Sequence, residues 1–127
     1  MENLVIYRCN HCGNIAVKLK DVGVPLVCCG EVMQPLTAKN TDGAVEKHKP
    51  VVQIENGVVK VCVGEVAHPM TDEHYIEFIL LELQNGYAVK FLKPNDEPKA
   101  EFALPDGEKV VRAYAYCNLH SLWVTEI

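Results

Sequence analysis

Cysteine and histidine are the residue types of this 127-residue chain that could bind a metal ion, and it contains six cysteines and five histidines. Four cysteines lie between Cys9 and Cys29, whereas four histidines follow residue 47. Thiolate and imidazole groups are common protein ligands of zinc and iron. The sequence therefore offers two candidate metal sites of different chemistry, one rich in sulfur and one rich in nitrogen.

The sulfur-rich candidate begins with Cys9 and Cys12, a C-x2-C knuckle whose turn lets two thiolates bind one metal ion. A second pair, Cys28 and Cys29, follows after 15 residues, with no residue between its members. Four thiolates form a closed tetrahedral site that suits zinc or iron, and the spacing alone favours neither metal. Side chains of adjacent residues splay apart, so this pair is expected to distort the tetrahedron. His11, inside the knuckle, is expected to be solvated.

The nitrogen-rich candidate is spread over three motifs, residues 46–50 (EKHKP), 68–75 (HPMTDEHY) and 117–120 (CNLH). Each motif lies in a loop or at the end of a predicted strand, where a rigid sheet can present ligands. One histidine alone is more often an exposed or hydrogen-bonded side chain, but this concentration favours a metal site. The candidate ligands are His48, His68, His74, Cys117 and His120. Because zinc prefers four ligands, a set of five favours a redox metal such as iron.

The elements that must position the nitrogen-rich motifs are predicted to be β-strands. Residues 51–55 and 58–63 flank Asn56-Gly57, a dipeptide that supplies the positive φ angles of a two-residue type I′ hairpin turn. A second hairpin is predicted with its turn at Asn85-Gly86. The other predicted strands are residues 75–83, 87–92, 109–116 and 121–127. Residues 93–108 contain three prolines, which argue against a helix there, and the whole pattern predicts a sandwich of two antiparallel sheets.

Cys62 differs from the other five cysteines because it lies within a predicted strand. Alternation along residues 58–63 places it on the same face as Lys60 and opposite three valines. It is therefore predicted to be a small, partly buried apolar side chain and not a metal ligand.

Two domains are predicted, residues 1–37 and 38–127, because the cysteine cluster and the histidines segregate along the chain. The connection, residues 37–44, lacks large apolar side chains and carries turn residues. A domain of about 37 residues buries too little apolar surface to be stable alone, so the first domain is expected to need a metal as a staple.

Composition excludes several classes of protein. With 49% hydrophobic and 23% charged residues, the chain is neither disordered nor collagen-like. Its longest stretch without Asp, Glu, Lys or Arg, residues 113–125, is shorter than the ~20 residues of a membrane-spanning helix. A formal net charge of −5 without a basic stripe argues against nucleic-acid binding. The first residues lack the features of a signal peptide, so a reducing cytoplasm is expected, where cysteines are more often metal ligands than disulfides.

The whole chain resembles the desulfoferrodoxins, a family of two-iron superoxide reductases. Residues 1–37 are similar to a desulforedoxin domain, with its C-x2-C-x15-C-C pattern. Residues 38–127 are similar to the neelaredoxin-type catalytic domain and carry E-K-H-x-P, H-P-M-x3-H-Y and C-N-x-H in that order. Each motif alone is modest, but the four together form a specific signature.

The resemblance implies an all-β fold, a small metal-stapled domain followed by an immunoglobulin-like sandwich of seven strands. It also implies two iron ions per chain. Centre I would be Fe(Cys)4, held by Cys9, Cys12, Cys28 and Cys29. Centre II would be Fe(His)4(Cys), with equatorial nitrogens from four histidines and an axial thiolate, held by His48, His68, His74, Cys117 and His120. The implied activity is one-electron reduction of superoxide to hydrogen peroxide in a homodimer that detoxifies superoxide, with a rubredoxin-type electron donor.

Two further catalytic residues are expected next to His48. Lys47 would place a cation beside the open iron position, where it would attract anionic superoxide and help organise water for proton delivery. Without the motif, Lys47 would be interpreted as an ordinary surface lysine. Glu46 resembles the family glutamate that can occupy the sixth position of the ferric enzyme.

Two other functions remain open from the sequence. The chain could be a non-catalytic electron-transfer or metal-binding module, whose second centre has no exchangeable position and binds no added anion. It could also be a zinc-ribbon binding domain fused to a β-sandwich, which zinc in the first site would favour.

Overall fold

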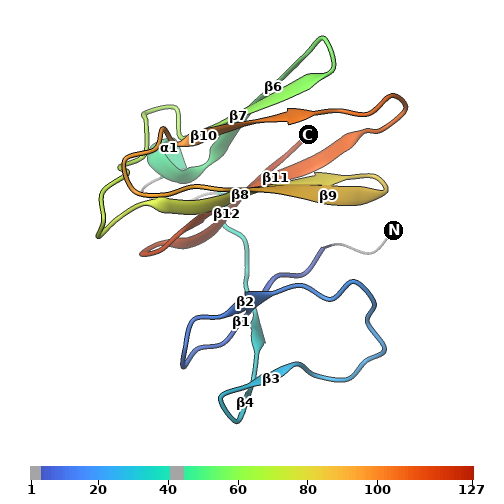
Figure 1. Ribbon diagram of the computed structural model, residues 1–127, viewed down its shortest axis with the longest axis vertical. Coiled ribbons are helices and arrows are strands. Elements are labelled where there is room, and N and C mark those ends of the chain that lie inside the picture. Colours follow the sequence, from blue (N-terminus) through green and yellow to red (C-terminus); the bar gives the residue numbers. More distant parts are fainter. Residues whose placement is uncertain (1–3, 41–44) are drawn as a thin grey trace. The chain divides into compact units, whose positions relative to one another are not determined.

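The computed structural model describes residues 4–40 and 45–127 and divides into two compact units, Met1–Thr37 and Ala38–Ile127. The described residues contain no helix long and apolar enough to cross a membrane. Figure 1 shows that strands predominate in both units. The predicted all-β class is confirmed, with a single-turn helix as the exception among the described residues.

The first unit carries the cysteine pairs on very short strands. They are β1 (Tyr7–Arg8), β2 (Ile15–Ala16), β3 (Val27–Cys28), β4 (Glu31–Val32) and β5 (Gln34–Pro35). An antiparallel sheet has the order β2-β1-β5, and β3 pairs with β4 as a hairpin. Ile6, Cys9 and Met33 are the buried hydrophobic side chains among its described residues. So small a core leaves much of the stability of this unit to a bound metal.

The second unit is a sandwich of two antiparallel sheets, the upper and lower layers in Figure 1. Among its described residues it has seven strands, as the resemblance implied. They are β6 (Pro50–Glu55), β7 (Val58–Val63), β8 (Ile76–Leu83), β9 (Gly86–Phe91), β10 (Lys99–Ala103), β11 (Val110–Cys117) and β12 (Ser121–Glu126). One sheet has the order β10-β7-β6 and the other β12-β11-β8-β9.

The core of the sandwich lies between the two sheets. It contains the alternate valines of β7, Ile79 and Leu81 of β8, and two alanines of β11. Cys117 belongs to the same cluster and is 0% exposed. One candidate metal ligand is therefore anchored directly in the core.

The first predicted hairpin is confirmed. Asn56 and Gly57 have φ angles of 51° and 76°, which are those of a type I′ turn, and they join β6 to β7. The second hairpin differs by one residue from the prediction. Leu83 pairs with Gly86, so the turn consists of Gln84 and Asn85. Gly86 is the first residue of β9 and not part of the turn.

The interpretation of Cys62 was half wrong. Its strand alternates as predicted, with Val61 and Val63 buried and Lys60 on the opposite face. Cys62, however, is exposed, because β7 presents that face to solvent. It is therefore not a partly buried apolar side chain.

A glycine sets the approach of the chain after β7 to helix α1 (Val45–His48). Gly64 has a φ angle of +85°, and a Cβ atom there would lie 2.7 Å from the carbonyl oxygen of Lys47 and 2.4 Å from that of Val66. The N–H of Gly64 donates to the carbonyl oxygen of Lys49, 3.1 Å away. Only glycine allows this backbone-to-backbone contact, which supports the segment that carries His48.

Candidate metal centres

The C-x2-C knuckle of centre I is held by its own backbone. Gly13 has a φ angle of 85°, and its N–H donates to the carbonyl oxygen of Cys9. The N–H of Cys12 donates to the sulfur of Cys9, and the N–H of Asn14 donates to the sulfur of Cys12, both at 3.5 Å. Such bonds stabilise thiolates, which are the form of cysteine that binds a metal.

The adjacent pair reaches the same site because it lies at a hairpin turn. Cys28 ends β3, and Cys29 and Gly30 have φ angles of 54° and 74°, which form a type I′ turn before β4. The left-handed conformation of Cys29 turns its side chain back toward that of Cys28. Adjacent cysteines on extended backbone would point to opposite sides.

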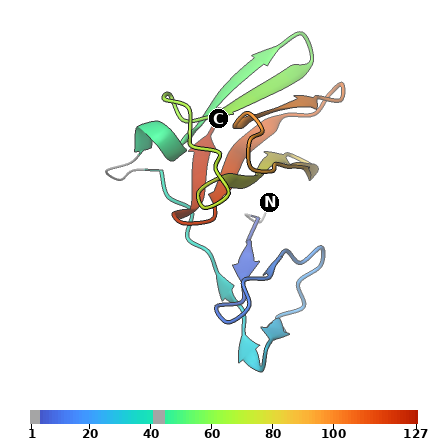
Figure 2. The ribbon, with the colours of Figure 1, turned by 60° about the vertical axis from the view of Figure 1, so that its left-hand side comes forward.

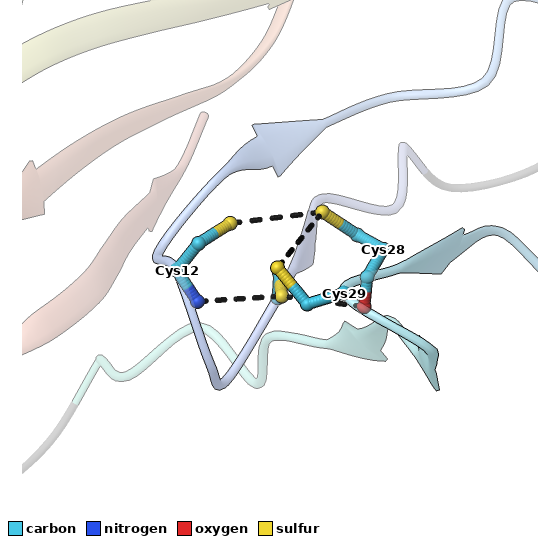
Figure 3. A group of neighbouring side chains, drawn as sticks. Cys12, Cys28 and Cys29 are labelled. Carbon is cyan, nitrogen blue, oxygen red and sulfur yellow. Dashed lines mark hydrogen bonds between the residues drawn. The ribbon is translucent and has the colours of Figure 1, made fainter.

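The four sulfur atoms of centre I have the spacing of a tetrahedral site. Sulfurs bound at 2.3 Å to a tetrahedral ion lie about 3.8 Å apart. The sulfur of Cys28 lies 3.6 Å from that of Cys12 and 4.0 Å from that of Cys29. Figure 3 shows these three side chains directing their sulfurs toward one another from the knuckle and the hairpin. With Cys9 included, all four sulfurs lie within 4.8 Å of one another.

The pKa shifts of Cys9 and Cys29 also indicate that centre I suits a bound cation. The N–H of Cys12, helped by that of His11, lowers the pKa of Cys9 to about 6. Cys29 shows the opposite shift, because its side-chain hydrogen bond with Cys12 raises its pKa to about 12. The close approach of the sulfurs thus opposes ionisation of all four thiols at once. A metal ion removes this conflict, so the residues present fit a metal site of four thiolates.

The candidate ligands of centre II converge at one end of the sandwich, to the left in Figure 1. His48 ends α1, His68 and His74 lie in the connection from β7 to β8, and the last two ligands, Cys117 and His120, flank the turn from β11 to β12. Figure 2 brings this end forward and shows α1 and that turn at the same end of the sandwich. Segments up to 72 residues apart in the sequence therefore contribute to one site.

The four imidazole rings lie next to one another in a closed set of four, called here the square because its four sides are nearly equal. Neighbouring ring centroids lie 4.6 Å apart (His48 and His68), 4.7 Å (His68 and His74), 5.0 Å (His74 and His120) and 4.7 Å (His120 and His48). The diagonal from His48 to His74 is 6.2 Å. Four imidazoles that bind one ion at 2.1 Å give sides of about 4.6 Å and a diagonal of about 6.5 Å. The observed square therefore has the size of an equatorial ligand set.

Specific nitrogen atoms face the centre of this square. The Nε2 atom of His48 lies 3.1 Å from the Nδ1 atom of His120. The Nε2 atoms of His68 and His74 are buried and have no hydrogen-bond partner. Buried nitrogens without a partner are costly unless a metal binds them. The set is thus three Nε2 atoms and one Nδ1 atom.

The protonation of His68 suits metal binding. Its Nδ1–H donates to the carbonyl oxygen of Pro69 at 2.7 Å, which leaves the lone pair on Nε2. Burial lowers the pKa of His68 to about 4, so the ring is neutral at pH 7. Burial also lowers the pKa of His74, assisted by the charges of His120 and Lys47. Neutral imidazoles can bind a metal without first losing a proton.

Cys117 supplies a sulfur to the same site. Its ligand atom and those of His48, His74 and His120 lie within 4.8 Å of one another. Burial raises the pKa of the Cys117 thiol, while the N–H groups of Leu119 and His120 act in the opposite direction. His68 falls outside this group of four and joins the site through the ring contacts described above. The donor set of imidazoles and one thiolate fits iron.

The remaining predicted residues lie around centre II or apart from it. Lys47 is exposed in the last turn of α1, close enough to His74 for its charge to lower the pKa of that histidine. The side chain of Glu46 lies outside the described residues. Cys62 and His11 are both exposed and belong to neither group of candidate ligands.

Sequence reasoning missed the residues that hold the ligands in place. The indole Nε1–H of Trp123 donates to the carbonyl oxygen of His120 at 3.1 Å. The backbone N–H of His74 donates to the hydroxyl of Thr71, also at 3.1 Å. Thr71 lies inside one motif and Trp123 follows another by three residues, but their hydrogen bonds could not be predicted from the sequence.

Two family models match the chain, desulfoferrodoxin N-terminal domain over residues 1–36 and desulfoferrodoxin over residues 40–126. Desulfoferrodoxin of Nitratidesulfovibrio vulgaris is 50% identical over 121 residues, which cover 95% of this chain and 94% of that protein. The crystal structure of the superoxide reductase from Treponema pallidum superposes with a TM-score of 0.82 at 35% identity, covering 98% of both chains. Superoxide reductase (1Fe-SOR) from Giardia intestinalis has a TM-score of 0.57 at 34% identity and covers 65% of this chain and 97% of its own.

Proposed function

The chain belongs to the desulfoferrodoxin family, and on that premise we propose that centre II is the place where it reduces superoxide. The protein is a superoxide reductase that holds two iron ions, one in a site of four cysteines and one in a site of four histidines and a cysteine. The overall reaction joins superoxide, one electron and two protons to give hydrogen peroxide. The observation that supports centre II best is the square of four imidazoles with the buried Cys117 thiol within reach.

The residues of centre II would bind the iron through two kinds of ligand. The imidazoles of His48, His68, His74 and His120 would supply four nitrogens, and Cys117 would supply the fifth ligand. When bound, the iron supplies the one-electron chemistry. Five protein ligands would leave room on a six-coordinate iron for the substrate to bind. Because Cys117 is buried in the sandwich core, substrate would reach the iron from the side away from the core.

Lys47 acts on the substrate through its charge. The protein carries a net charge of −5, so an anion approaching it is repelled unless a local cation reverses the field. Lys47 is exposed and its charge lowers the pKa of His74, which supports a role for this cation near the imidazoles. Its ammonium group attracts superoxide and holds water, from which the two protons are taken. We propose that Glu46, its neighbour in the sequence, would serve as a further ligand of the iron in the oxidised resting enzyme.

Centre I exchanges electrons with a redox partner in this proposal. Cys12 and Cys29 are exposed, so an iron ion held by them lies near the protein surface. Short distances to the surface favour electron exchange with a docked protein. We propose a rubredoxin-type donor, and a structural staple is the alternative role of this centre.

A second copy of the chain is proposed as a partner of the first unit. Large apolar side chains are exposed along one segment of it: Leu19 (89%), Val22 (71%), Val24 (64%), Val27 (64%) and Val32 (50%). An apolar surface of this kind is typical of an interface. Leu19→Lys is expected to give a monomer in sedimentation equilibrium, whereas Val66→Lys, at an exposed position of the second unit, leaves a dimer. A wild-type monomer contradicts the assignment.

The cellular location follows from cysteine chemistry. The six cysteines are all free, and each metal site needs reduced thiolates. A reducing cytoplasm keeps them available. We therefore propose that the protein removes superoxide in the cytoplasm, as part of the response to oxidative stress.

One assay tests the proposed function. Iron-loaded, prereduced protein is mixed with superoxide, and hydrogen peroxide and oxygen are both measured. Superoxide reduction gives one hydrogen peroxide per superoxide and no oxygen, whereas dismutation releases oxygen. A non-catalytic module consumes no superoxide, and added azide leaves the spectrum of its second centre unchanged. Release of oxygen, or a failure to consume superoxide together with an unchanged spectrum in azide, contradicts the proposal.

A further inference from the structure

The β-sheet does not by itself hold His74 next to the other ligands of centre II. Strands β8 and β11 pair as far as Ile76 and Cys117, where the register is already shifted by an irregularity after Tyr116. His74 lies two residues before Ile76 and therefore outside the paired strands. Some other contact must fix its position relative to Cys117.

Asn118 makes that contact with three hydrogen bonds. Its side-chain oxygen Oδ1 accepts from the N–H of Tyr75 at 3.0 Å, and its side-chain amide Nδ2 donates to the carbonyl oxygen of Glu73, also at 3.0 Å. Its backbone N–H donates to the carbonyl oxygen of Tyr75 at 3.2 Å. One residue thus binds the chain on both sides of His74.

The turn that carries His74 is closed within itself. The backbone N–H and carbonyl oxygen of His74 both bond to Thr71, with the N–H of Thr71 donating at 2.9 Å and its hydroxyl accepting at 3.1 Å. These bonds shape the turn but do not connect it to β11. Asn118, which follows Cys117 directly, provides that connection.

We propose that Asn118 is a positioning residue that fixes His74 relative to Cys117 and His120. It acts on the ligand loops through their backbones and touches neither the substrate nor the iron. This inference rests on the proposed ligand set of centre II. It assigns to the second residue of the C-N-x-H motif a task separate from metal binding.

Asparagine suits this task because one side chain must both donate and accept. Aspartate keeps the acceptor for Tyr75 but loses the donor to Glu73 and introduces a charge. Alanine loses both side-chain bonds and keeps the bond from the backbone N–H. Asn118→Asp therefore removes one side-chain hydrogen bond, and Asn118→Ala removes both.

The buried Nε2 atom of His74 makes the metal site sensitive to this contact. That atom has no partner in the protein, so its orientation depends on the turn that carries it. Removing a residue that orients a metal ligand commonly weakens metal binding 10–100-fold, on the order of magnitude seen for such partners. The expected loss for Asn118→Ala lies in this range, with Asn118→Asp between it and the wild type.

The test follows the removal of iron from centre II by a chelator, monitored through the thiolate-to-iron absorption band of that centre. Asn118→Ala is expected to release iron about 10–100-fold faster than the wild type. Asn85→Ala serves as the control, because the amide of Asn85 also bridges two segments, to Glu108, in a hairpin away from the site. The control is expected to release iron at the wild-type rate.

A double-mutant cycle shows whether Asn118 acts through His74. In a His74→Ala background, Asn118→Ala is expected to change the release rate by less than about twofold, because the ligand it positions is gone. Equal effects in both backgrounds overturn the inference, and so does a wild-type rate in Asn118→Ala. If Asn118→Ala does not fold, Asn118→Asp takes its place in the cycle. Failure of the wild type to form the absorption band would instead contradict the ligand set and the proposed function.

Discussion

The indole ring of Trp123 is stacked on the imidazole of His48, with ring centroids 4.8 Å apart and planes inclined by 21°. The indole is 1% exposed, and its N–H donates to the carbonyl oxygen of His120. One side chain therefore supports two ligands of centre II that are 72 residues apart in the sequence. The ammonium group of Lys39 lies 5.6 Å from the centroid of the same indole.

Trp123→Phe separates the two contacts of Trp123. Phenylalanine retains a stacking ring but lacks the N–H, so the carbonyl oxygen of His120 loses a donor. The expected cost is about 1–3 kcal/mol of unfolding free energy, measured by urea unfolding of the metal-free protein. Trp123→Leu also loses the stacking and is expected to cost about 3–5 kcal/mol, as large-to-small changes at buried aromatics do. An unchanged stability of Trp123→Phe would argue against a role of the indole N–H, and equal costs for the two variants would argue against a contribution from the stacking.

Gly64→Ala tests the close approach of the backbone to Lys47. An added Cβ meets two carbonyl oxygens at 2.4 and 2.7 Å, so the segment that carries His48 must shift. A loss of about 2–4 kcal/mol is expected, together with weaker iron binding at centre II. Gly107→Ala is the matched control, because its φ angle is +84° and nothing lies within 4 Å of the added atom. If both variants lose the same free energy, the left-handed φ angle and not the contact explains the glycine.

Elements with local turn chemistry could be predicted, and those without it could not. Asn56-Gly57 specifies its hairpin by residue type alone. Strand β10, in contrast, falls in the proline-rich segment and has one large apolar residue, Phe102, so its alternation was too weak to recognise. It becomes a strand because it pairs with β7 along five residues. Helix α1, a single turn, is too short to show a period.

The site divides in the same way. Few residue types bind a metal ion, so the candidate ligands and their motifs could be predicted from the sequence. The residues that aim them depend on contacts between distant segments, as with Trp123 and His48. The turn at Cys29 was also unforeseen, because asparagine, aspartate or glycine normally occupies that left-handed position.

Lys47→Ala is expected to slow the reaction of reduced protein with superoxide by about tenfold at low ionic strength. Loss of the cation beside His74 leaves the repulsion of a net negative protein unopposed. The difference from the wild type should shrink as salt is added, because salt screens the attraction. Pulse radiolysis measures the bimolecular rate. Lys49→Ala removes the same charge two residues away, and an equal loss in this control would contradict a specific role for Lys47.

Cys117→Ser is expected to abolish the thiolate-to-iron band of centre II and leave that of centre I unchanged. Serine is a poor ligand for iron at neutral pH, and the group of candidate ligands around Cys117 contains no second cysteine. Visible spectra of oxidised protein report both bands. Cys62→Ser is the control, since Cys62 is exposed on β7 and should alter neither. Persistence of the band in Cys117→Ser would make Cys62 the first alternative ligand to test.

Cys28→Ser distinguishes the two proposed roles of centre I, which are an electron relay from the donor to centre II and a structural staple of the first unit. Cys28 contacts the sulfurs of both Cys12 and Cys29, so its loss is expected to remove the iron of centre I and its absorption band. The reaction of prereduced centre II with superoxide should not change, because the ligands of centre II come from the other unit.

Turnover with a rubredoxin-type donor is the informative measurement for Cys28→Ser. A relay predicts that steady-state turnover falls at least tenfold while the single-turnover rate is kept. A staple predicts that both rates are kept and that residues 4–37, whose buried apolar side chains are few, become sensitive to proteolysis. Loss of turnover together with proteolysis is resolved by Asn14→Ala. That variant removes the amide donor 3.6 Å from the sulfur of Cys28 but retains all four ligands, so it perturbs the electronic environment of the centre and keeps the staple.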